Sequence, residues 1–320
     1  MKTRNIQLDV AKGLCLLLMI AGHIKGIDPG LYHFIYSFHM PAFFVIAGMT
    51  YVASQSSKRY LVWSKFKRLI IPAWIFGAIN GLPFLARLFR GVIDMPDFVH
   101  RFVGTFTGAA QVNDTFNCTP LWFLYAVFLV YLFEIAASRL LQPRARFALL
   151  LVILLLLFIN PWAYQVFAPV QLKYALTGIL FFQVGVLLKE RMNPPQSGHH
   201  YFLLSISFIV WIGLASLSPT VQLNSGFLGT GGEILLSFFA ALAGVFFIIQ
   251  LAHILSDLPY LPLLAQISLP IVGLNYLVEQ RLNTYIEGMA LFVIEAMILI
   301  LIASLTTKTG PVGRLLNGRI

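Results

Sequence analysis

The stretch Val10–Ile27 reads VAKGLCLLLMIAGHIKGI. It is long and apolar enough to cross a bilayer, because the hydrocarbon core is about 30 Å thick and a helix rises about 1.5 Å per residue. The ionisable side chains of Lys12 and His23 lie within it, and Lys25 lies near its end. Such groups are costly inside a membrane and usually face a bundle interior or a wet cavity. The stretch therefore predicts a spanning helix that also carries chemistry.

The composition extends this prediction to the whole chain. Of 320 residues, 59% are hydrophobic and only 11% are charged, against about 25% charged in ordinary soluble domains. The mean hydropathy is +0.84. This composition excludes a soluble enzyme, a disordered chain and a disulfide scaffold. It predicts an all-α, polytopic membrane protein with one domain over residues 1–320.

Ten apolar segments are candidate spanning helices, with Pro-, Gly- or Asn-rich breaks between several of them. They are residues 10–27, 33–53, 69–88, 120–138, 147–166, 173–188, 201–218, 231–252, 260–278 and 288–306. With the N-terminus inside, the inner segments hold fifteen Lys and Arg residues and the outer segments hold six. This positive-inside bias predicts that both termini are cytoplasmic. It also accounts for the formal net charge of +10 without a nucleic-acid partner.

Lys12 and His23 are eleven positions apart, which is close to three helical turns, so both project from one face of the first helix. The rise between them is roughly 16 Å, with Lys12 at the cytoplasmic end and His23 toward the outside. A snorkelling Lys12 and a His23 bonded to a backbone carbonyl would explain them equally well. Gly22, just before His23, permits a close approach by another backbone or by a substrate.

His39 in the second span lies at roughly the depth of His23 and would share a pocket with it, unless it only packs between helices. Asp28 in the connecting loop is placed to orient His23, or is simply solvated. Arg68, with Lys65 and Lys67, is either an anchor at the cytoplasmic interface or a phosphate site beside Lys12.

Further polar groups lie in the later spans. Asn275 would donate a hydrogen bond to a substrate or bridge two helices. Glu134 lies near a span end and can reach the interface. Glu295 lies deeper in the last span, and the sequence supplies no partner for it. No motif with metal-ligand spacing occurs, so we expect no metal.

The pattern resembles the acyltransferase-3 family of integral-membrane O-acyltransferases, over most of the chain. The resembling pieces occur in order: Lys12 followed by Gly22-His23, the run Phe38-His39-Met40-Pro41 through Gly48 as in the sugar O-acetylase branch, Lys67 through Pro72, Leu121-Trp122-Phe123-Leu124, and Ser268-Leu269-Pro270-Ile271. The last motif often ends in His, whereas Asn275 is the nearby polar residue in this chain.

The resemblance implies acyl transfer from acyl-CoA, usually acetyl-CoA, to a hydroxyl of a cell-surface or lipid-linked carbohydrate. No cofactor is permanently bound, because acetyl-CoA is a co-substrate. Catalytic roles fall on His23, as general base, and on His39; donor binding falls on Lys12, Arg68 and Trp122. Asn275 and Asp28 are assigned oxyanion-stabilising or orienting roles.

A multi-pass protein of the bacterial cytoplasmic membrane, in contact with its lipids, fits these expectations. The alternative is a secondary transporter or glycan flippase, which would also carry buried polar residues in many spans. No internal repeat supports that alternative, and the polar residues concentrate in the first two spans.

Overall fold

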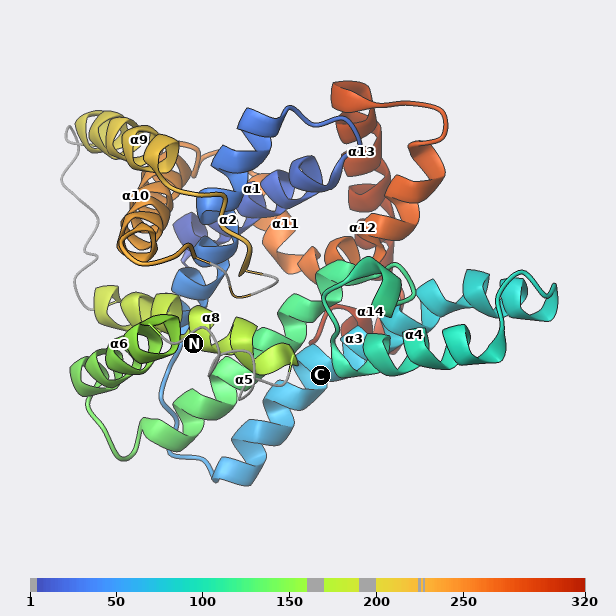
Figure 1. Ribbon diagram of the computed structural model, residues 1–320, viewed down its shortest axis with the longest axis horizontal. Coiled ribbons are helices and arrows are strands. Elements are labelled where there is room, and N and C mark those ends of the chain that lie inside the picture. Colours follow the sequence, from blue (N-terminus) through green and yellow to red (C-terminus); the bar gives the residue numbers. More distant parts are fainter. Residues whose placement is uncertain (1–4, 160–169, 190–199, 224–225, 227, 320) are drawn as a thin grey trace. The chain divides into compact units, whose positions relative to one another are not determined.

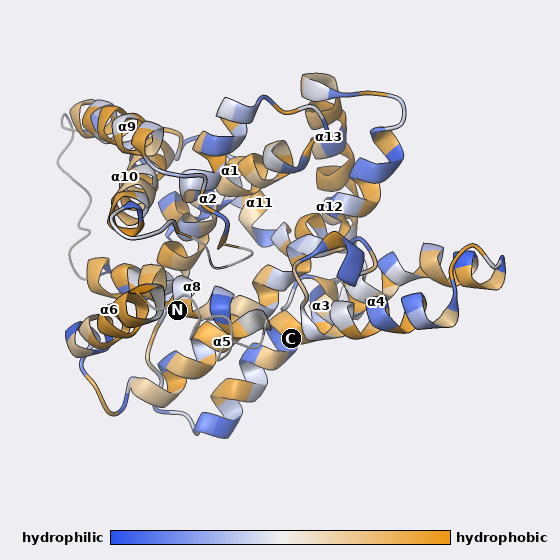
Figure 2. Cartoon of the chain, viewed as in Figure 1, coloured by the Kyte–Doolittle hydropathy of each residue, from blue (hydrophilic) through white to orange (hydrophobic). Residues whose placement is uncertain are grey.

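Helices form every regular element in the part of the chain that the computed structural model describes, which is residues 5–159, 170–189, 200–223, 226 and 228–319 (Figure 1). Apolar residues run along most of these helices (Figure 2). The prediction of an all-α protein is therefore confirmed.

Seven helical segments of the described chain are long and apolar enough to cross a membrane. They are Ile6–His23 (α1), Pro29–Thr50 (α2), Lys58–Phe89 (α3), Thr119–Ala137 (η2 with α5), His200–Leu217 (α9), Glu233–Ile254 (α10) and Gly288–Thr306 (α13). The other predicted spans overlap helices outside this group, namely α6 (Pro143–Ile159), α8 (Val170–Leu188) and α12 (Ser268–Leu282). The span count of ten and the cytoplasmic termini stay predictions; Lys2, Arg4, Arg191 and residues 160–166 lie outside the described residues.

Several segments differ from the sequence-based prediction. Helix α3 begins at Lys58, well before the predicted span of residues 69–88, and α14 (Gly310–Leu316) lies outside every predicted span. Residues 260–278, predicted as one span, contain two helices, α11 (Leu261–Gln266) and α12, which are separated at Ile267. Pro270 lies in the first turn of α12, where a missing N–H costs least. An additional helix, α4 (Met95–Thr107), begins at the Asp94 cap and ends at Gly108, whose φ is 84°. Its 13 residues mix apolar and charged side chains, so hydropathy alone did not reveal it.

The described chain forms two compact units. Unit 1 comprises residues up to Gly22, Ile27–Ser54 and Phe133–Ala265. Within it α10 packs against α9 and α2, and α2 packs against α8. Small residues permit this packing: a Cβ added at Gly48 would lie 2.0 Å from the carbonyl oxygen of Phe182, and one at Gly185 would lie 2.0 Å from that of Val45. The α2 and α8 backbones are therefore in direct contact.

Unit 2 comprises His23–Gly26, Gln55–Leu132 and Gln266–Ile320. Helix α12 packs against α13, α3 and the short η2 turn (Thr119–Leu121), and α14 (Gly310–Leu316) packs against α3 and α13. The 3-10 turn η1 (Val112–Asp114) packs against α4. Buried aromatic side chains of α3 and of the segment before α5, such as Phe76 and Phe116, form the core of this unit. The single-domain assignment stays a prediction.

Candidate active site

In unit 2, side chains of α3 contact the backbone of α12 at Gly273. A Cβ added at Gly273 would lie 2.3 Å from the ring of Phe76, so only glycine permits this approach. The buried Asn80 side chain donates from Nδ2 to the carbonyl oxygens of Phe76 and Gly273, both at 2.8 Å. These contacts fix the part of α12 that carries the polar residues Asn275 and Tyr276.

Asn275 and Glu295 form a buried polar pair between α12 and α13. Nδ2 of Asn275 donates to Oε1 of Glu295 at 2.7 Å, and both residues are 0% exposed. Among the described residues, neither Oδ1 of Asn275 nor Oε2 of Glu295 has a hydrogen-bond partner. Unsatisfied buried polar atoms are costly and concentrate at functional sites. The prediction that Asn275 bridges two helices is confirmed, and Glu295 gains the partner that the sequence did not supply.

His23, the last residue of α1, lies beside Tyr276, the residue of α12 that follows Asn275. Its ring is 5.3 Å from that of Tyr276, centroid to centroid, in an edge-to-face arrangement with an angle of 65° between the planes. Because Tyr276 directly follows Asn275, the imidazole lies next to the turn of α12 that carries the buried amide. Unit 2 therefore brings together one imidazole, one phenol, one amide and one carboxyl group.

The loop after His23 is attached to the start of α13. The backbone N–H of Gly288 donates to the carbonyl oxygen of Lys25 at 3.2 Å. Nζ of Lys25 lies 2.6 Å from Oε1 of Glu287, and both side chains are exposed. The hydrogen bond and charge of Glu287 raise the pKa of Lys25 above its ordinary value. These contacts fix the position of the chain at His23 relative to α12 and α13.

Trp122 begins α5, directly after η2, which packs against α12. It is buried, with its ring edge-on to Phe123. A small cavity of about 210 Å³ lies further along α12. Its polar lining includes Asn117 and Gln280, whose side chains are hydrogen-bonded at 3.0 Å, and Arg281.

His39 and Asp28 belong to unit 1. His39 is buried in α2, where its Nδ1 donates to the carbonyl oxygen of Ile35 at 2.8 Å and its ring packs edge-on against Tyr36. A Cβ at Gly22 would lie 2.9 Å from that tyrosine ring, so a side chain approaches Gly22 here. The predicted approach by another backbone or by a substrate stays a prediction. Asp28 caps α2 by accepting from the Leu31 N–H at 2.9 Å. Because His23 lies in the other unit, a pocket shared with His39 and an orienting role for Asp28 stay predictions.

The predicted cationic residues also lie in different units. Lys12 is partly buried on α1, in the same continuous helix as His23. Arg68 is exposed on α3, one turn after Lys65, whose Nζ lies 3.5 Å from the ring centroid of Tyr131. Their joint role in donor binding stays a prediction. Within the described residues, no three His, Cys, Asp or Glu side chains gather in a group that would hold a metal ion.

A family model described as an acyltransferase domain, Acyl_transf_3, matches residues 5–307. The chain is a member of the acyltransferase-3 family. No curated protein and no solved structure matches it. Together with the apolar helices, the family assignment identifies a multi-pass membrane acyltransferase.

For an acyltransferase, the chemistry available in unit 2 is proton transfer and the orientation of a hydroxyl. An imidazole can accept a proton, and the amide oxygen of Asn275, which has no hydrogen-bond partner among the described residues, is a hydrogen-bond acceptor. Sequence reasoning identified His23, Asn275 and Glu295 separately but did not join them. Asn275 and Glu295 are each ten residues from Tyr285 in the α12–α13 connection. In an antiparallel helix pair, residues equidistant from the loop lie opposite each other, and this spacing was the available signal.

Proposed function

We propose that this acyltransferase moves an acyl group, most simply acetyl, from acyl-CoA to a hydroxyl of a cell-surface or lipid-linked carbohydrate, with His23 as the general base. The single observation that carries the proposal is the position of His23 against Tyr276, beside the buried Asn275–Glu295 pair. Buried titratable and amide groups adjoin at this site, in a chain whose family transfers acyl groups.

In the proposed reaction, His23 takes the proton of the acceptor hydroxyl as its oxygen attacks the thioester carbonyl. The new C–O bond forms the ester, the C–S bond breaks, and the leaving thiolate receives the proton from His23. Imidazole suits both steps because its ring nitrogens can accept a proton and release it again. The atoms balance without a further reagent.

Asn275 orients the carbohydrate in this proposal. Its Nδ2 is directed to Glu295, while Oδ1 has no hydrogen-bond partner among the described residues. Oδ1 would accept from a second hydroxyl of the sugar, because the single proton of the reacting hydroxyl goes to His23. This differs from an oxyanion role, which needs a donor. Glu295 is then a positioning residue, because it fixes which end of the amide faces the substrate.

The two substrates approach from opposite ends of the predicted transmembrane path. Lys12 and Arg68 would attract the anionic part of acyl-CoA from the cytoplasm, and Trp122 would contact its acyl-bearing arm. The carbohydrate would approach near the small cavity lined by Asn117, Gln280 and Arg281, whose amide and guanidinium groups suit sugar hydroxyls. We place the protein in the bacterial cytoplasmic membrane, where both substrate types are accessible.

The test is acyl transfer by His23→Ala and His23→Gln proteins in cells that make the acceptor glycan. Loss of a general base lowers the rate about 10²- to 10⁴-fold, so the acetyl group should disappear from the glycan mass spectrum. His100→Ala is the matched control, because His100 is exposed on α4 and contacts Asp114. Membrane levels of each variant are measured in parallel. Full acetylation by His23→Gln at normal protein level would refute the assignment.

A further inference from the structure

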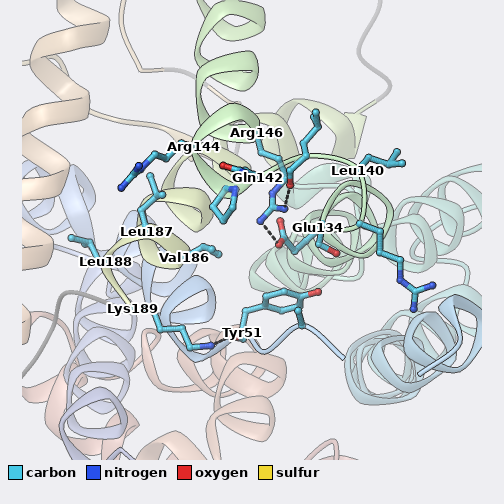
Figure 3. A pocket seen from close by; sticks show the side chains of 15 residues that line it. Tyr51, Glu134, Leu140, Gln142, Arg144, Arg146, Val186, Leu187, Leu188 and Lys189 are labelled. Carbon is cyan, nitrogen blue, oxygen red and sulfur yellow. Dashed lines mark hydrogen bonds and ion pairs between the residues drawn. The ribbon is translucent and has the colours of Figure 1, made fainter. Parts of the chain in front are cut away.

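Unit 1 contains a cavity of about 780 Å³ where the C-terminal ends of α2, α5 and α8 meet the start of α6 (Figure 3). Four cationic side chains line it, those of Arg139, Arg144, Arg146 and Lys189. Among the lining residues Glu134 supplies the single carboxylate. The lining therefore carries a formal charge of +3, which favours an anionic occupant.

The cavity is built around a buried ion pair. Nη2 of Arg146 lies 3.0 Å from Oε1 of Glu134, and the two side chains are 4% and 1% exposed. Nη1 of Arg146 donates to the carbonyl oxygen of Leu141 at 2.6 Å. The other carboxylate oxygen of Glu134 accepts from Nε2 of Gln183, also at 2.6 Å. The sequence-based expectation that Glu134 simply reaches the interface is therefore wrong.

These contacts fix the position of Arg146 but do not use all of its hydrogen-bond donors. Its Nε is buried and has no hydrogen-bond partner among the described residues. A buried ion pair gives little net stability, because desolvation offsets the attraction between the charges. Orientation in the membrane also does not require it, since exposed cations in loops are sufficient for the positive-inside rule. A preorganised guanidinium beside a cationic cavity has the geometry of a phosphate site.

The remaining walls are consistent with a phosphate ester attached to a larger group. Figure 3 shows Lys189 directed toward Tyr51, where its Nζ donates to the backbone carbonyl oxygen of Tyr51. Leu140, Leu187 and Leu188 supply apolar surface. Helix α6 begins at Pro143 in the lining, so its unpaired N–H groups add positive potential. The volume lies in the range of sites that enclose nucleotide-sized ligands.

We propose that this cavity binds the phosphate groups of a phosphate ester on the side of the membrane that the Lys and Arg distribution predicts to be cytoplasmic. Two sources supply that chemistry there. One is the nucleotide end of CoA, which rests on the proposed function, and the other is the head group of an anionic phospholipid. The cavity contains none of the residues proposed above for donor binding, Lys12, Arg68 and Trp122. The nucleotide source would therefore assign the phosphates of CoA to this cavity and not to Lys12 and Arg68.

The test uses the full-length protein in nanodiscs and the double variant Arg144→Gln/Lys189→Gln, which removes two exposed cations and retains the buried pair. The matched control is Lys58→Gln/Arg59→Gln, two exposed cations at the start of α3. In phosphatidylcholine nanodiscs, CoA binding is measured by calorimetry. In nanodiscs that contain phosphatidylglycerol, bound lipid is counted by native mass spectrometry.

Loss of two exposed charge contacts weakens binding about tenfold. A loss of that size for CoA, confined to the Arg144/Lys189 variant, identifies the nucleotide source. A loss confined to phosphatidylglycerol identifies the lipid source. Equal binding of both probes by the two double variants overturns the proposal. Arg146→Lys keeps the buried charge but lacks the several N–H donors of the guanidinium, so it should weaken binding of the same ligand.

Failure of this proposal and failure of the proposed function give different results. The binding measurements require no turnover, so His23→Ala should bind CoA and phosphatidylglycerol as the unmodified protein does. If transfer requires His23 but Arg144→Gln/Lys189→Gln leaves ligand binding unchanged, only the proposal that the cavity binds a phosphate ester is refuted. If Arg144→Gln/Lys189→Gln weakens binding but His23→Gln transfers acetyl groups normally, only the assignment of His23 as the general base is refuted.

Discussion

Glu134 in unit 1 and Glu295 in unit 2 are both buried in apolar helices, yet their partners differ. Glu134 contacts a guanidinium and an amide, through Arg146 and Gln183. Glu295 contacts an amide, Asn275, and its second oxygen has no hydrogen-bond partner among the described residues. The charge of the first carboxylate is balanced by Arg146, whereas the second is the one that we propose positions Asn275. The comparison indicates that the choice of partner, and not burial alone, distinguishes a carboxylate that balances a buried charge from one proposed to act in catalysis.

The largest effect is expected from Glu134→Gln. This change leaves Arg146 buried without its counter-charge, which costs about 3–5 kcal/mol of stability. Unfolding in detergent micelles measures the loss. The double variant Glu134→Gln/Arg146→Met removes both charges and should recover most of it. If the single variant is as stable as the unmodified protein, the ion pair does not have the role described.

Glu295→Gln, the same substitution in the other unit, should lower the acyl-transfer rate but not the stability. Stability should stay the same or rise, because a desolvated carboxyl group is replaced by a neutral amide of equal size. The acyl-transfer rate should fall about 10- to 100-fold, because the Gln side chain can turn either its oxygen or its NH₂ group to Asn275 and so no longer fixes which end of that amide faces the substrate. Parallel measurement of unfolding and glycan acetylation separates the two effects. Normal acetylation would show that Glu295 does not position Asn275.

The smallest effect concerns the exposed pair of Lys25 and Glu287, beside the site of unit 2. The pKa of Lys25 in the folded protein is raised above its ordinary value of 10.5. The ion pair therefore contributes its full stability at any pH below 10.5, and this contribution is lost as the pH rises through the higher folded-state pKa. Lys25→Met should therefore lower the melting temperature slightly at neutral pH and not at strongly alkaline pH. Added salt should shrink the difference. A difference that grows with pH would contradict this assignment.

Hydropathy was sufficient to predict the helices, because each spanning segment must satisfy its backbone internally and present apolar side chains to lipid. It did not predict α4, whose charged residues mask its helix, or the break at Ile267. The site was predicted in parts. His23 and Asn275 can be identified because polar residues are rare in apolar helices, whereas Tyr276 is identified only by its contact with His23 in the structure. The Arg146–Glu134 pair was missed for the same reason, since it requires the packing around the α5–α6 connection.

The reciprocal glycine contacts at Gly48 and Gly185 have a mechanical consequence. With each glycine seated against the opposite main chain, α2 and α8 cannot slide or rotate past one another without a collision of backbone atoms. Any motion that accompanies substrate entry must therefore move both helices together as one rigid body. Tyr51 and Lys189, just beyond the ends of these helices, would then move together, so the part of the cationic cavity that they line would keep its shape.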